Sequence, residues 1–436
     1  MWSITFADTG GLPASTLAQI EAVFDEATAY WGRYIDFNGA TLEVEVQILD
    51  LGFGTLAQAG PEFFFDRFEG GQSIFEAGPI IELTTGVDPD PNVADIFVDI
   101  DRATILSGEY FFGSLADGNE VPNRTFDLLS VILHELTHGL GFLSILDEPG
   151  TNAVTFDLFV EPRGSGLGFV GPASSSILPG GFIPLRDNDP SHTDGIVNLM
   201  NAFIRDGERL ILSEIDVAVL SDLGLPILGP TNGNDILYGF ERTFASLTYP
   251  GGNDTISLLG GDDQYFGLSG DDSVHGDGGA DLIDGGTGTN ILNGGAGNDT
   301  LVGEGSNQAS VFSGNEGNDF LVGPVNLYGG EGDDTLSLGS DGEAVSGATL
   351  RGEGGIDSLT FADFSVPVAI NASDAVIDNG DGPTLDPMSV DWAGGFVSID
   401  GFETLEGTAF GDTLIGGDGS NYIMGGGGND LLIGEA

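Results

Sequence analysis

A nine-residue repeat rich in glycine and aspartate is the feature that most limits what this 436-residue chain can fold into. From position 254, an Asp or Asn recurs at every ninth residue, and a large apolar residue follows each one two positions later. The Asp and Asn positions are Asp254, Asp263, Asp272, Asp281, Asn290 and Asp299, and the apolar positions are Ile256, Tyr265, Val274, Ile283, Leu292 and Leu301. This fixed spacing predicts a repetitive structure in which equivalent side chains stack on one another.

The composition of each repeat favours cation binding. Full copies are GDGGADLID at 276–284, GGTGTNILN at 285–293 and GGAGNDTLV at 294–302. Glycines permit turns that ordinary residues resist, and such turns direct backbone carbonyls and aspartate carboxylates at one ion. The triplet around the apolar residue then forms a short strand with that residue facing inward. A flexible Gly/Asp linker is the alternative interpretation, and the regularly spaced apolar residues argue against it.

These repeats match the pattern GGxGxDxUx, where U is a large apolar residue, so this region resembles the RTX calcium-binding proteins. The resemblance implies a parallel β-roll with two nonapeptides in each coil. Residues two repeats apart then share a row of structural calcium ions. The two rows would contain Asp263, Asp281 and Asp299 on one side, and Asp254, Asp272 and Asn290 on the other.

Further copies of the repeat follow, with irregular spacing. A second block at the end of the chain supplies Asp412, Asn421 and Asp430 as calcium ligands. Isolated copies at 314–322, 329–337 and 352–360 supply Asp319, Asp334 and Asp357. Residues 361–400 lack the motif. We therefore expect roll blocks near 233–302 and 403–433, separated by interrupted repeats and a β-rich insertion near 311–402.

The excess of acidic residues limits the kinds of molecule that the chain can bind. The chain has 69 acidic residues against 10 arginines and no lysine, a formal net charge of −59. This excess excludes nucleic-acid binding and makes an anchor on anionic lipid improbable, because both need a positive patch. After position 242, Arg351 is the single cation. Without calcium this half repels itself, so calcium-binding energy becomes folding energy.

Folding that depends on calcium suits export of an unfolded chain from a cytosol that is low in calcium. The RTX resemblance implies a secreted, extracellular protein that leaves through a type I secretion apparatus, which needs no N-terminal signal. The N-terminus lacks the basic and apolar regions of a signal peptide, and no apolar stretch is long enough to span a membrane. Because three residues follow the last repeat, we expect the chain to be a fragment or a trimmed form.

The first half of the chain has the pattern of a globular domain. A Gly/Pro-containing linker at 224–232 separates it from the repeats, giving domains at 1–229 and 230–436. Apolar periodicity predicts helices at 16–35, 125–140 and 213–223, the first capped by Ser15 or Thr16. Alternation predicts a strand at 42–48, and a second is expected at 95–100. Helices flanking a few strands indicate an α+β domain.

The second of these helices carries a zinc-site motif, His134-Glu135-Leu136-Thr137-His138. Histidines four residues apart lie on one helical face, so both imidazoles can reach one metal ion. Glu135, beside the first ligand, can act as the general base toward water that zinc activates. A chance match with two structural histidines is the alternative interpretation.

The motif continues as HExxHxxG, with Gly141 placed for a sharp turn, and so resembles the metzincin proteases. Most metzincins carry a third histidine where this chain has Ser144. The chain has four histidines, and His275 lies in the repeats, which leaves His192. The 54-residue gap to His192 and the later Met200 resemble the leishmanolysin family. The resemblance implies zinc ligands His134, His138 and His192, with Met200 as the floor of the site.

The sequence leaves alternatives open for the third ligand and for the function. Asp157 and Glu161 have spacings near those of zinc proteases with a carboxylate ligand. The expected fold is an α+β metzincin-like zinc protease domain followed by an all-β parallel RTX β-roll. The expected function is a secreted zinc endopeptidase acting on proteins or peptides. The alternatives are a calcium-dependent adhesin or surface-layer protein with a vestigial zinc fold, and a hydrolase of non-peptide amides or esters.

Overall fold

The chain folds into two compact units, Met1–Leu228 and Gly229–Ala436. The computed structural model describes residues 1–436 except positions 53, 71, 115–120, 146–151, 165, 177–179, 188, 195–197, 202–203, 230–235, 239–252, 304–308, 324, 340–347, 373–388, 393–394, 418–419 and 435–436. The first unit is α+β, and the second is built from parallel strands. Each unit is described on its own below.

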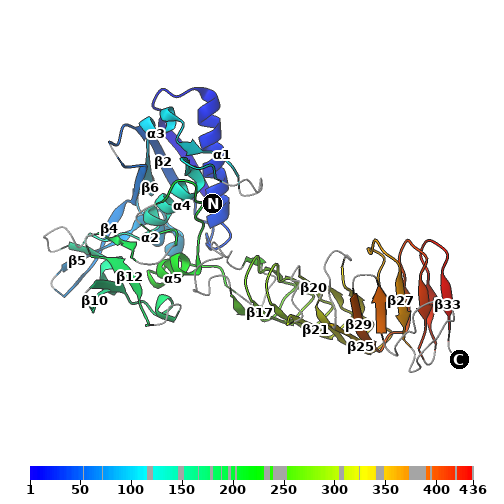
Figure 1. Ribbon diagram of the computed structural model, residues 1–436. Coiled ribbons are helices and arrows are strands. Elements are labelled where there is room, and N and C mark those ends of the chain that lie inside the picture. The colour runs from blue at the N-terminus through cyan, green and yellow to red at the C-terminus, as the bar shows by residue number, and fades with distance from the viewer. Residues whose placement is uncertain are drawn as a thin grey trace. The chain divides into compact units, whose positions relative to one another are not determined.

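A four-stranded sheet forms the centre of the first unit (Figure 1). Its strands lie in the order β1 (Trp2–Asp8), β2 (Leu42–Leu49), β6 (Ile96–Asp101) and β3 (Ala57–Pro61). The first three are parallel, and β3 runs antiparallel at the edge. The expected alternation is present in β2, whose residues from Leu42 onward are buried and half-buried in turn. An alternating pattern therefore predicted this strand correctly because one face of it lies on the core.

Helix α1 (Ala14–Trp31) packs its apolar face into the core through Ile20, Phe24 and Trp31. It begins and ends earlier than the periodicity predicted, and the prediction of a Ser15 or Thr16 cap is wrong. Pro13 occupies the N-cap, and its side chain makes no capping hydrogen bond. The fixed backbone of Pro13 lets the helix begin at Ala14, so Ser15 and Thr16 lie within its first turn and cannot cap it.

Helix α4 (Leu128–Gly139) carries the HExxH motif and is buried along its whole length. Asp127 caps it by accepting a hydrogen bond from the Ser130 backbone N–H at 3.1 Å. Two glycines at its end are required by the packing. A Cβ on Gly139 would lie 2.4 Å from Cγ2 of Ile96 in β6, and Gly141 turns the chain away with a φ of +119°. The expected turn at Gly141 is therefore confirmed.

The remaining elements of this unit surround the sheet and α4. The other helices are α2 (Gly78–Thr85), α3 (Arg102–Ser107) and α5 (Glu214–Asp222), with short 3-10 turns η1 (Thr155–Phe159) and η2 (Ser174–Ser176). A three-stranded sheet contains β4 (Phe63–Glu69), β5 (Gln72–Ala77) and β9 (Asn152–Val154), and β7 (Tyr110–Phe111) pairs with β8 (Phe126–Asp127). A four-stranded antiparallel sheet contains β10 (Val160–Arg163), β11 (Gly166–Phe169), β12 (Ile183–Arg186) and β13 (Asp189–Thr193).

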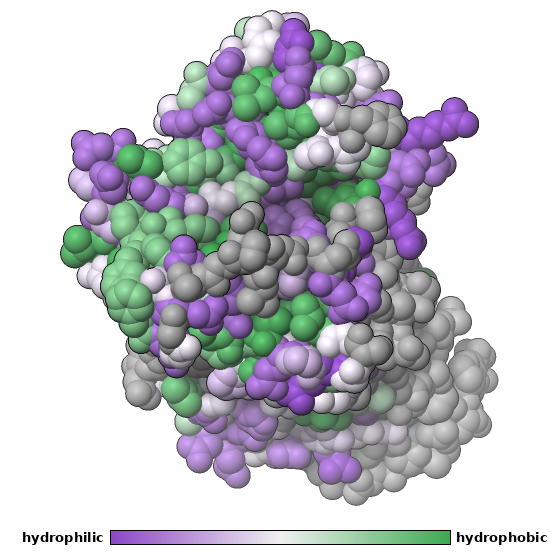
Figure 2. Space-filling view, turned by 90° about the vertical axis from the view of Figure 1, so that its left-hand side faces the viewer, coloured by the Kyte–Doolittle hydropathy of each residue, from purple (hydrophilic) through white to green (hydrophobic). Residues whose placement is uncertain are grey.

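The surface of the first unit is mixed in polarity. Figure 2 shows hydrophilic and hydrophobic residues interspersed over the described part of the face that it displays. Two neighbouring aromatic rings of β4, Phe65 and Phe68, are among the exposed large apolar side chains. Among the described residues, no helix has both the length and the apolar character needed to cross a membrane.

The second unit is a roll of two sheets whose strands are parallel except where β28 pairs with β27 and β29, and successive nonapeptides contribute strands to opposite sheets. One sheet contains, in order, β14 (Ile236–Tyr238), β16 (Gln264–Phe266), β18 (Leu282–Asp284), β20 (Thr300–Val302), β22 (Phe320–Val322), β24 (Thr335–Ser337), β26 (Ser358–Thr360), β30 (Thr404–Glu406) and β32 (Tyr422–Met424). The other contains β15 (Thr255–Ser257), β17 (Ser273–Gly278), β19 (Ile291–Ala296), β21 (Val311–Glu316), β23 (Asn326–Glu331), β25 (Ala348–Gly354), β29 (Gly395–Asp400), β28 (Ser389–Trp392), β27 (Val368–Asn371), β31 (Thr413–Ile415) and β33 (Leu431–Ile433).

The regular repeats stack as the nine-residue period predicted. Tyr265 lies opposite Ile283, and Ile283 lies opposite Leu301, so each coil contains two nonapeptides. These apolar side chains are almost fully buried and form one continuous core along the roll. The expectation of parallel β-sheets with inward apolar residues is therefore confirmed for the described repeats.

The irregularly spaced copies continue the roll rather than standing apart from it. The coil offset between equivalent aspartates changes from 18 residues to 20 at Asp319, to 15 at Asp334 and to 23 at Asp357. The strands of these copies nevertheless pair in the same two sheets. Coils of 15 to 23 residues fit the same two sheets because the differences in length fall between the strands.

Residues 361–400 are a strand-containing addition to one sheet of the roll. Antiparallel β27, β28 and β29 join β25 to β31 within that sheet. The expected β-rich insertion is thus part of the roll where it is described, and residues 373–388 and 393–394 of it lie outside the described residues. Part of the expected first block, at 233–235 and 239–252, also lies outside them.

The buried ion pair at the start of α4 generates a stability prediction. Asp127 is fully buried and accepts hydrogen bonds from Arg209 Nε at 3.0 Å and Nη2 at 2.8 Å. Replacing Asp127 by Ala removes the helix cap and leaves the Arg209 guanidinium without its counterion. We expect the free energy of unfolding to fall by about 3–5 kcal/mol in urea titrations. The exposed Asp36→Ala control should change it by less than about 0.5 kcal/mol.

Candidate metal sites

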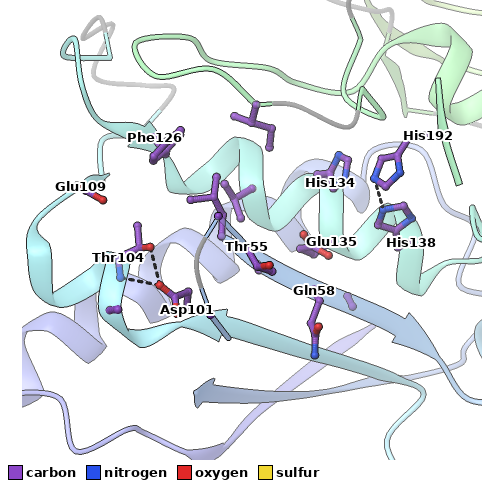
Figure 3. Close-up of a pocket in the computed structure, with 18 of the residues that line it drawn as sticks. Thr55, Gln58, Asp101, Thr104, Glu109, Phe126, His134, Glu135, His138 and His192 are labelled. Atoms are coloured by element: carbon purple, nitrogen blue, oxygen red, sulfur yellow. Dashed lines mark hydrogen bonds between the residues drawn. The ribbon is translucent and has the colours of Figure 1, made fainter. Parts of the chain in front are cut away.

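A cleft of about 1120 Å³ runs along α4 and the edge strand β3. His134, Glu135, His138 and His192 line one part of it, and Thr55 and Gln58 lie nearby on the β3 segment (Figure 3). The other part of the cleft extends past Asp101, Thr104, Glu109 and Phe126. The HExxH residues therefore lie on the wall of a cleft that is large enough for several residues of an extended peptide.

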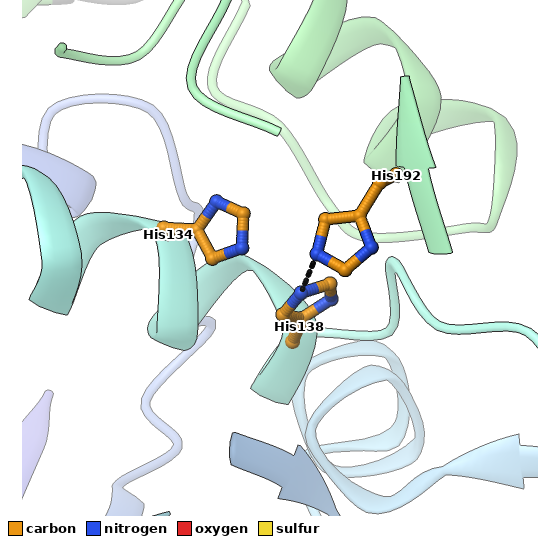
Figure 4. Close-up of side chains that lie close together, drawn as sticks. All are labelled: His134, His138 and His192. Carbon is orange, nitrogen blue, oxygen red and sulfur yellow. Dashed lines mark hydrogen bonds between the residues drawn. The ribbon is translucent and has the colours of Figure 1, made fainter. Parts of the chain in front are cut away.

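Three histidines converge at this wall from two distant segments (Figure 4). His134 and His138 project from adjacent turns of α4, and His192 projects from β13, the edge strand of its sheet. The metal-binding nitrogens of the three rings lie within 4.8 Å of one another. The structure thus brings together the three residues that the sequence nominated as zinc ligands.

Each imidazole is oriented by a hydrogen bond at its Nδ1 atom. His134 Nδ1 lies 2.7 Å from the Leu199 carbonyl, and His138 Nδ1 lies 2.7 Å from the Phe142 carbonyl. His192 Nδ1 lies 2.8 Å from a carboxylate oxygen of Asp189. Since all three partners are acceptors, each Nδ1 carries the proton. Each Nε2 is then an unprotonated lone pair, which is the form that binds a metal ion.

The spacing of these lone pairs fits a tetrahedral metal ion. The Nε2 atoms of His138 and His192 lie 3.3 Å apart. Two unprotonated nitrogens cannot hydrogen-bond to each other, so this approach is repulsive unless a cation lies between them. Zn–N distances of about 2.0–2.1 Å in a tetrahedral site place neighbouring nitrogens about 3.3 Å apart. The residues present therefore fit a zinc ion.

Burial keeps these rings neutral. It lowers the pKa of His134 to about 4, with a smaller contribution from the nearby His192 ring. Burial also lowers the pKa of His138 well below its usual range, and that of His192 less, because Asp189 opposes the shift. Neutral imidazoles at pH 7 leave their lone pairs available to a metal ion.

Glu135 is placed to exchange protons at the same site. Its carboxyl group is buried, and burial raises its pKa to about 8, with a backbone hydrogen bond to Ala59 of β3 opposing the shift. A cation bound by the neighbouring histidines would lower this pKa again and favour the carboxylate form. The environment thus holds the pKa of Glu135 in the range that suits a general base.

The segment that contains Met200 meets the histidine cluster through Leu199. Leu199, which supplies the acceptor for His134, precedes Met200 directly, and both are fully buried. The Thr193 N–H donates to the Met200 carbonyl at 2.9 Å, which ties the turn to the segment that carries His192. Asn198 braces the turn by bonding to Thr193 and to buried Asp216. The role of Met200 as the floor of a zinc site stays a prediction.

The alternative carboxylate ligands lie in other arrangements. Asp157 accepts hydrogen bonds from the Ser144 hydroxyl at 2.6 Å and the Val154 N–H at 3.0 Å. Glu161 is exposed and pairs with Arg163 at 2.8 Å. Neither belongs to the histidine cluster among the described residues. Ser144, at the position of the usual third histidine, instead orients Asp157.

Three residues that support the histidines were absent from the sequence-based set of site residues. Asp189 orients His192, and the Leu199 and Phe142 carbonyls orient His134 and His138. Asp189 lies three residues before His192, so an acidic residue near the candidate ligand was a visible signal. The Phe142 carbonyl left no such signal, because any residue supplies a backbone carbonyl.

The predicted calcium residues of the roll form rows along its length. The Oδ1 atom of each aspartate accepts a hydrogen bond from the backbone N–H one coil earlier. The Asp263 N–H donates to Asp281, and the Asp281 N–H donates to Asp299, at 2.8 and 2.9 Å. The same pattern links Asp254 to Asp272 and Asp272 to Asn290. The two predicted rows are therefore present as hydrogen-bonded stacks.

The second oxygen of most of these carboxylates accepts no hydrogen bond. Among the described residues, the buried Oδ2 atoms with this property include those of Asp272, Asp281, Asp299, Asp319, Asp334 and Asp357. Each unsatisfied buried carboxylate oxygen is unfavourable unless a cation or a donor meets it. The Asp299 Oδ2 faces Gly294, where a Cβ would come within 2.3 Å of it, so a side chain there would fill the space. These oxygens fit the hard, oxygen-liganded calcium ion.

Three predicted calcium positions are satisfied by the protein itself. The Asn290 amide donates to the Gly285 carbonyl at 2.7 Å, and the Asn421 amide donates to the Gly417 carbonyl at 2.7 Å. Both oxygens of Asp412 accept hydrogen bonds, from Val368 and from Thr408. An asparagine in the row thus replaces the cation with a side-chain donor. The remaining predicted positions, Asp254, Asp263 and Asp430, continue the stacks.

A further ladder was missed in the sequence analysis. The residue just before the row aspartate accepts a hydrogen bond from the backbone one coil later. The pairs are Asn253 with Asp271, Asp262 with Ala280, Asp271 with Thr289, Asn298 with Asn318, Asn318 with Asp333, and Asp333 with Ile356. The recurring Asn-Asp and Asp-Asp dipeptides were the available signal. This outer ladder aligns the coils independently of the cation.

Comparison with known protein families agrees with the geometry of the roll. The RTX calcium-binding nonapeptide repeat matches residues 251–274, 275–307, 302–323, 325–342 and 399–434. No curated protein matches the chain. The matched residues all lie in the second unit, and repeats of this family are typical of secreted proteins. The roll of this chain is therefore built from RTX calcium-binding repeats.

Proposed function

We propose that the first unit is a zinc-dependent endopeptidase and that the RTX roll is its calcium-folded companion. The observation that carries the proposal is the convergence of three Nε2 lone pairs, each fixed by a hydrogen bond at Nδ1. A purely structural role for these histidines would not explain why their three unprotonated Nε2 atoms meet at one point without a hydrogen-bond donor. The site also lies on an open cleft, as a catalytic metal requires.

The residues around the cluster supply the other parts of a hydrolytic site. A bound zinc ion would supply a Lewis acid that polarises a carbonyl oxygen and acidifies water. Glu135 accepts the proton of the attacking water and returns it to the leaving amine. Asp189 holds the His192 ring in the tautomer that presents Nε2, and the Leu199 and Phe142 carbonyls do the same for His134 and His138.

The edge strand of the central sheet favours a peptide over a smaller substrate. Strand β3 pairs with β6 on one side only, and Ala57, Gln58 and Ala59 line the cleft. An exposed sheet edge can add an extended peptide as a further strand. The same strand bonds to Glu135 through Ala59, so a peptide bound along it would pass the proposed base.

A calcium-dependent adhesin remains the second candidate. The stacked repeats and the strongly acidic composition serve such a protein equally well. We also infer that the protein is secreted by a type I apparatus, since the repeats are typical of proteins that leave in this way. Zinc content and proteolysis separate the two candidates, because an adhesin with a vestigial site would show neither.

The first test of the proposal is a Glu135→Gln substitution. Glutamine keeps the shape of the side chain and cannot accept the proton. We expect casein hydrolysis to fall about 100- to 10,000-fold while zinc content stays unchanged. The exposed Glu161→Gln variant is the matched control and should keep full activity. Equal activity in the Glu135→Gln and unmodified proteins would refute the proposed base.

The second test concerns the third ligand. We expect His192→Ala to lose most of its zinc during dialysis, because one of three nitrogen donors is gone. Asp157→Asn should keep its zinc, since Asp157 bonds to Ser144 and the backbone instead. Metal analysis of both variants beside the unmodified protein checks this. Retained zinc in His192→Ala, with loss in Asp157→Asn, would make Asp157 the ligand.

The third test concerns pH and calcium. Burial raises the pKa of Asp272, Asp299 and Asp334 to about 7, against an ordinary value of about 3.9. A raised pKa means that the folded state prefers the protonated form. The calcium-free roll is therefore stable below about pH 4 and loses stability as pH rises toward about 7. Calcium, which binds the carboxylates, should reverse this dependence above pH 7.

Circular dichroism of calcium-depleted protein between pH 4.5 and 8 checks this expectation. The β-sheet signal should decline as pH rises, and added calcium should restore it. Asp299→Asn is the diagnostic variant, because Asn290 already shows an amide in this role. This variant should be more stable than the unmodified protein without calcium at pH 7.5, and less stable with calcium. A sheet signal that grows with pH without calcium would contradict the mechanism.

A further inference from the structure

Three carboxylates outside the histidine cluster converge in the first unit. Glu43 lies on β2, Glu82 on α2, and Asp95 directly before β6. One oxygen of each lies within 4.8 Å of the others. Glu82 and Asp95 are each only 4% exposed. Segments separated by about forty and by thirteen residues along the chain thus bring three acidic groups to one interior point.

Backbone groups satisfy only part of this cluster. The Thr41 N–H donates to Glu82 Oε1 at 3.1 Å, and the Glu43 N–H donates to Asp95 Oδ2 at 2.8 Å. The second oxygen of Glu82, Oε2, is fully buried and accepts no hydrogen bond. Burial without a donor is unfavourable for this oxygen, which also lies beside two other acidic groups. Either a cation or a proton shared between the acids would relieve this cost.

The charges of the surrounding chain do not balance the cluster. The arginines of the described chain that form ion pairs do so with other acids: Asp50, Asp66, Glu69, Asp127, Glu161 and Glu208. The Met1 ammonium is attracted by Glu82 and Glu43, but it donates its hydrogen bond to the Ala40 carbonyl. When all three acids are ionised, they exceed the one nearby ammonium by two charges, the charge of a divalent cation.

We propose that Glu43, Glu82 and Asp95 bind a calcium ion in the first unit, separate from the ions of the roll. Calcium–oxygen distances of 2.3–2.6 Å place ligand oxygens up to about 5 Å apart across the ion, so oxygens that lie within 4.8 Å of one another can share one ion. The donors are all oxygens, which favours calcium over zinc. The ion joins β2 and the start of β6, the two inner strands of the central sheet, to α2.

The alternative to a cation is a shared proton. Burial raises the pKa of Asp95 to about 8, and the nearby Glu82 and Glu43 add to the shift. A protonated Asp95 could then donate a hydrogen bond to a neighbouring carboxylate. The two arrangements differ in their response to Glu82→Gln. This change relieves repulsion in a proton-sharing cluster, and it removes a ligand from a cation site.

Terbium luminescence distinguishes the proposed site from the roll. Terbium replaces calcium and emits when a nearby tryptophan absorbs light. Trp2 lies on β1 opposite Leu42, the residue that precedes Glu43 on β2. The backbone of Trp2 is therefore one strand spacing from the strand that carries Glu43. The third tryptophan, Trp392, lies in the roll and is replaced by Phe in every protein tested. Excitation at the red edge of tryptophan absorption in the full-length chain then reports ions near Trp2 and Trp31 only.

We expect sensitised emission in the Trp392→Phe protein that calcium displaces competitively. The emission should be lost in Glu82→Gln and Asp95→Asn, and retained in Glu45→Gln, an acid two residues from Glu43 on the same strand face. The competition in the Trp392→Phe protein needs no further variant, so it remains decisive even if a variant does not fold. Absent emission, or equal emission in Glu82→Gln with a higher unfolding temperature without calcium, would overturn the proposal in favour of a shared proton.

Discussion

Repulsion between electron-rich groups that the fold holds close together is the constraint on which this structure depends. In the roll, buried aspartates stack one coil above another with their Oδ2 atoms unsatisfied. In the first unit, two histidine lone pairs face each other at 3.3 Å. Glu43, Glu82 and Asp95 repeat the situation with carboxylates alone. In each case the surrounding hydrogen bonds orient the groups but do not neutralise them, so each arrangement is suited to a cation.

The roll and the first unit hold their mutually repelling groups in place in different ways. The roll spreads its orphaned oxygens over many coils and aligns the coils with an outer Asn/Asp ladder that needs no cation. Asn290 shows that the cation of one coil can be replaced by an amide without breaking the stack. The histidine cluster instead depends on single acceptors, one for each ring, contributed by Leu199, Phe142 and Asp189. Loss of one of these acceptors would leave the corresponding imidazole without the hydrogen bond that orients it.

Several elements could be predicted because local chemistry decides them. Three examples are the alternation of β2, the buried helix of the HExxH motif and the period of the nonapeptides. Each depends on a pattern among residues that are close together in the sequence. The start of α1 could not be predicted from apolar spacing, because the backbone of Pro13 sets it. The copies at 314–322, 329–337 and 352–360 looked isolated because sequence spacing changes, although strand pairing continues across loops of different length.

The sequence by itself determined that the second half forms a calcium-binding repeat structure and that two histidines on one helix share a face. Both follow from fixed short spacings, nine residues in one case and four in the other. Only the tertiary structure decided that His192 joins His134 and His138 while Asp157 bonds to Ser144. It alone revealed the cluster of Glu43, Glu82 and Asp95. Contacts between distant segments depend on how a sheet and its helices pack. That packing produces no fixed, recognisable spacing between the residues in the sequence.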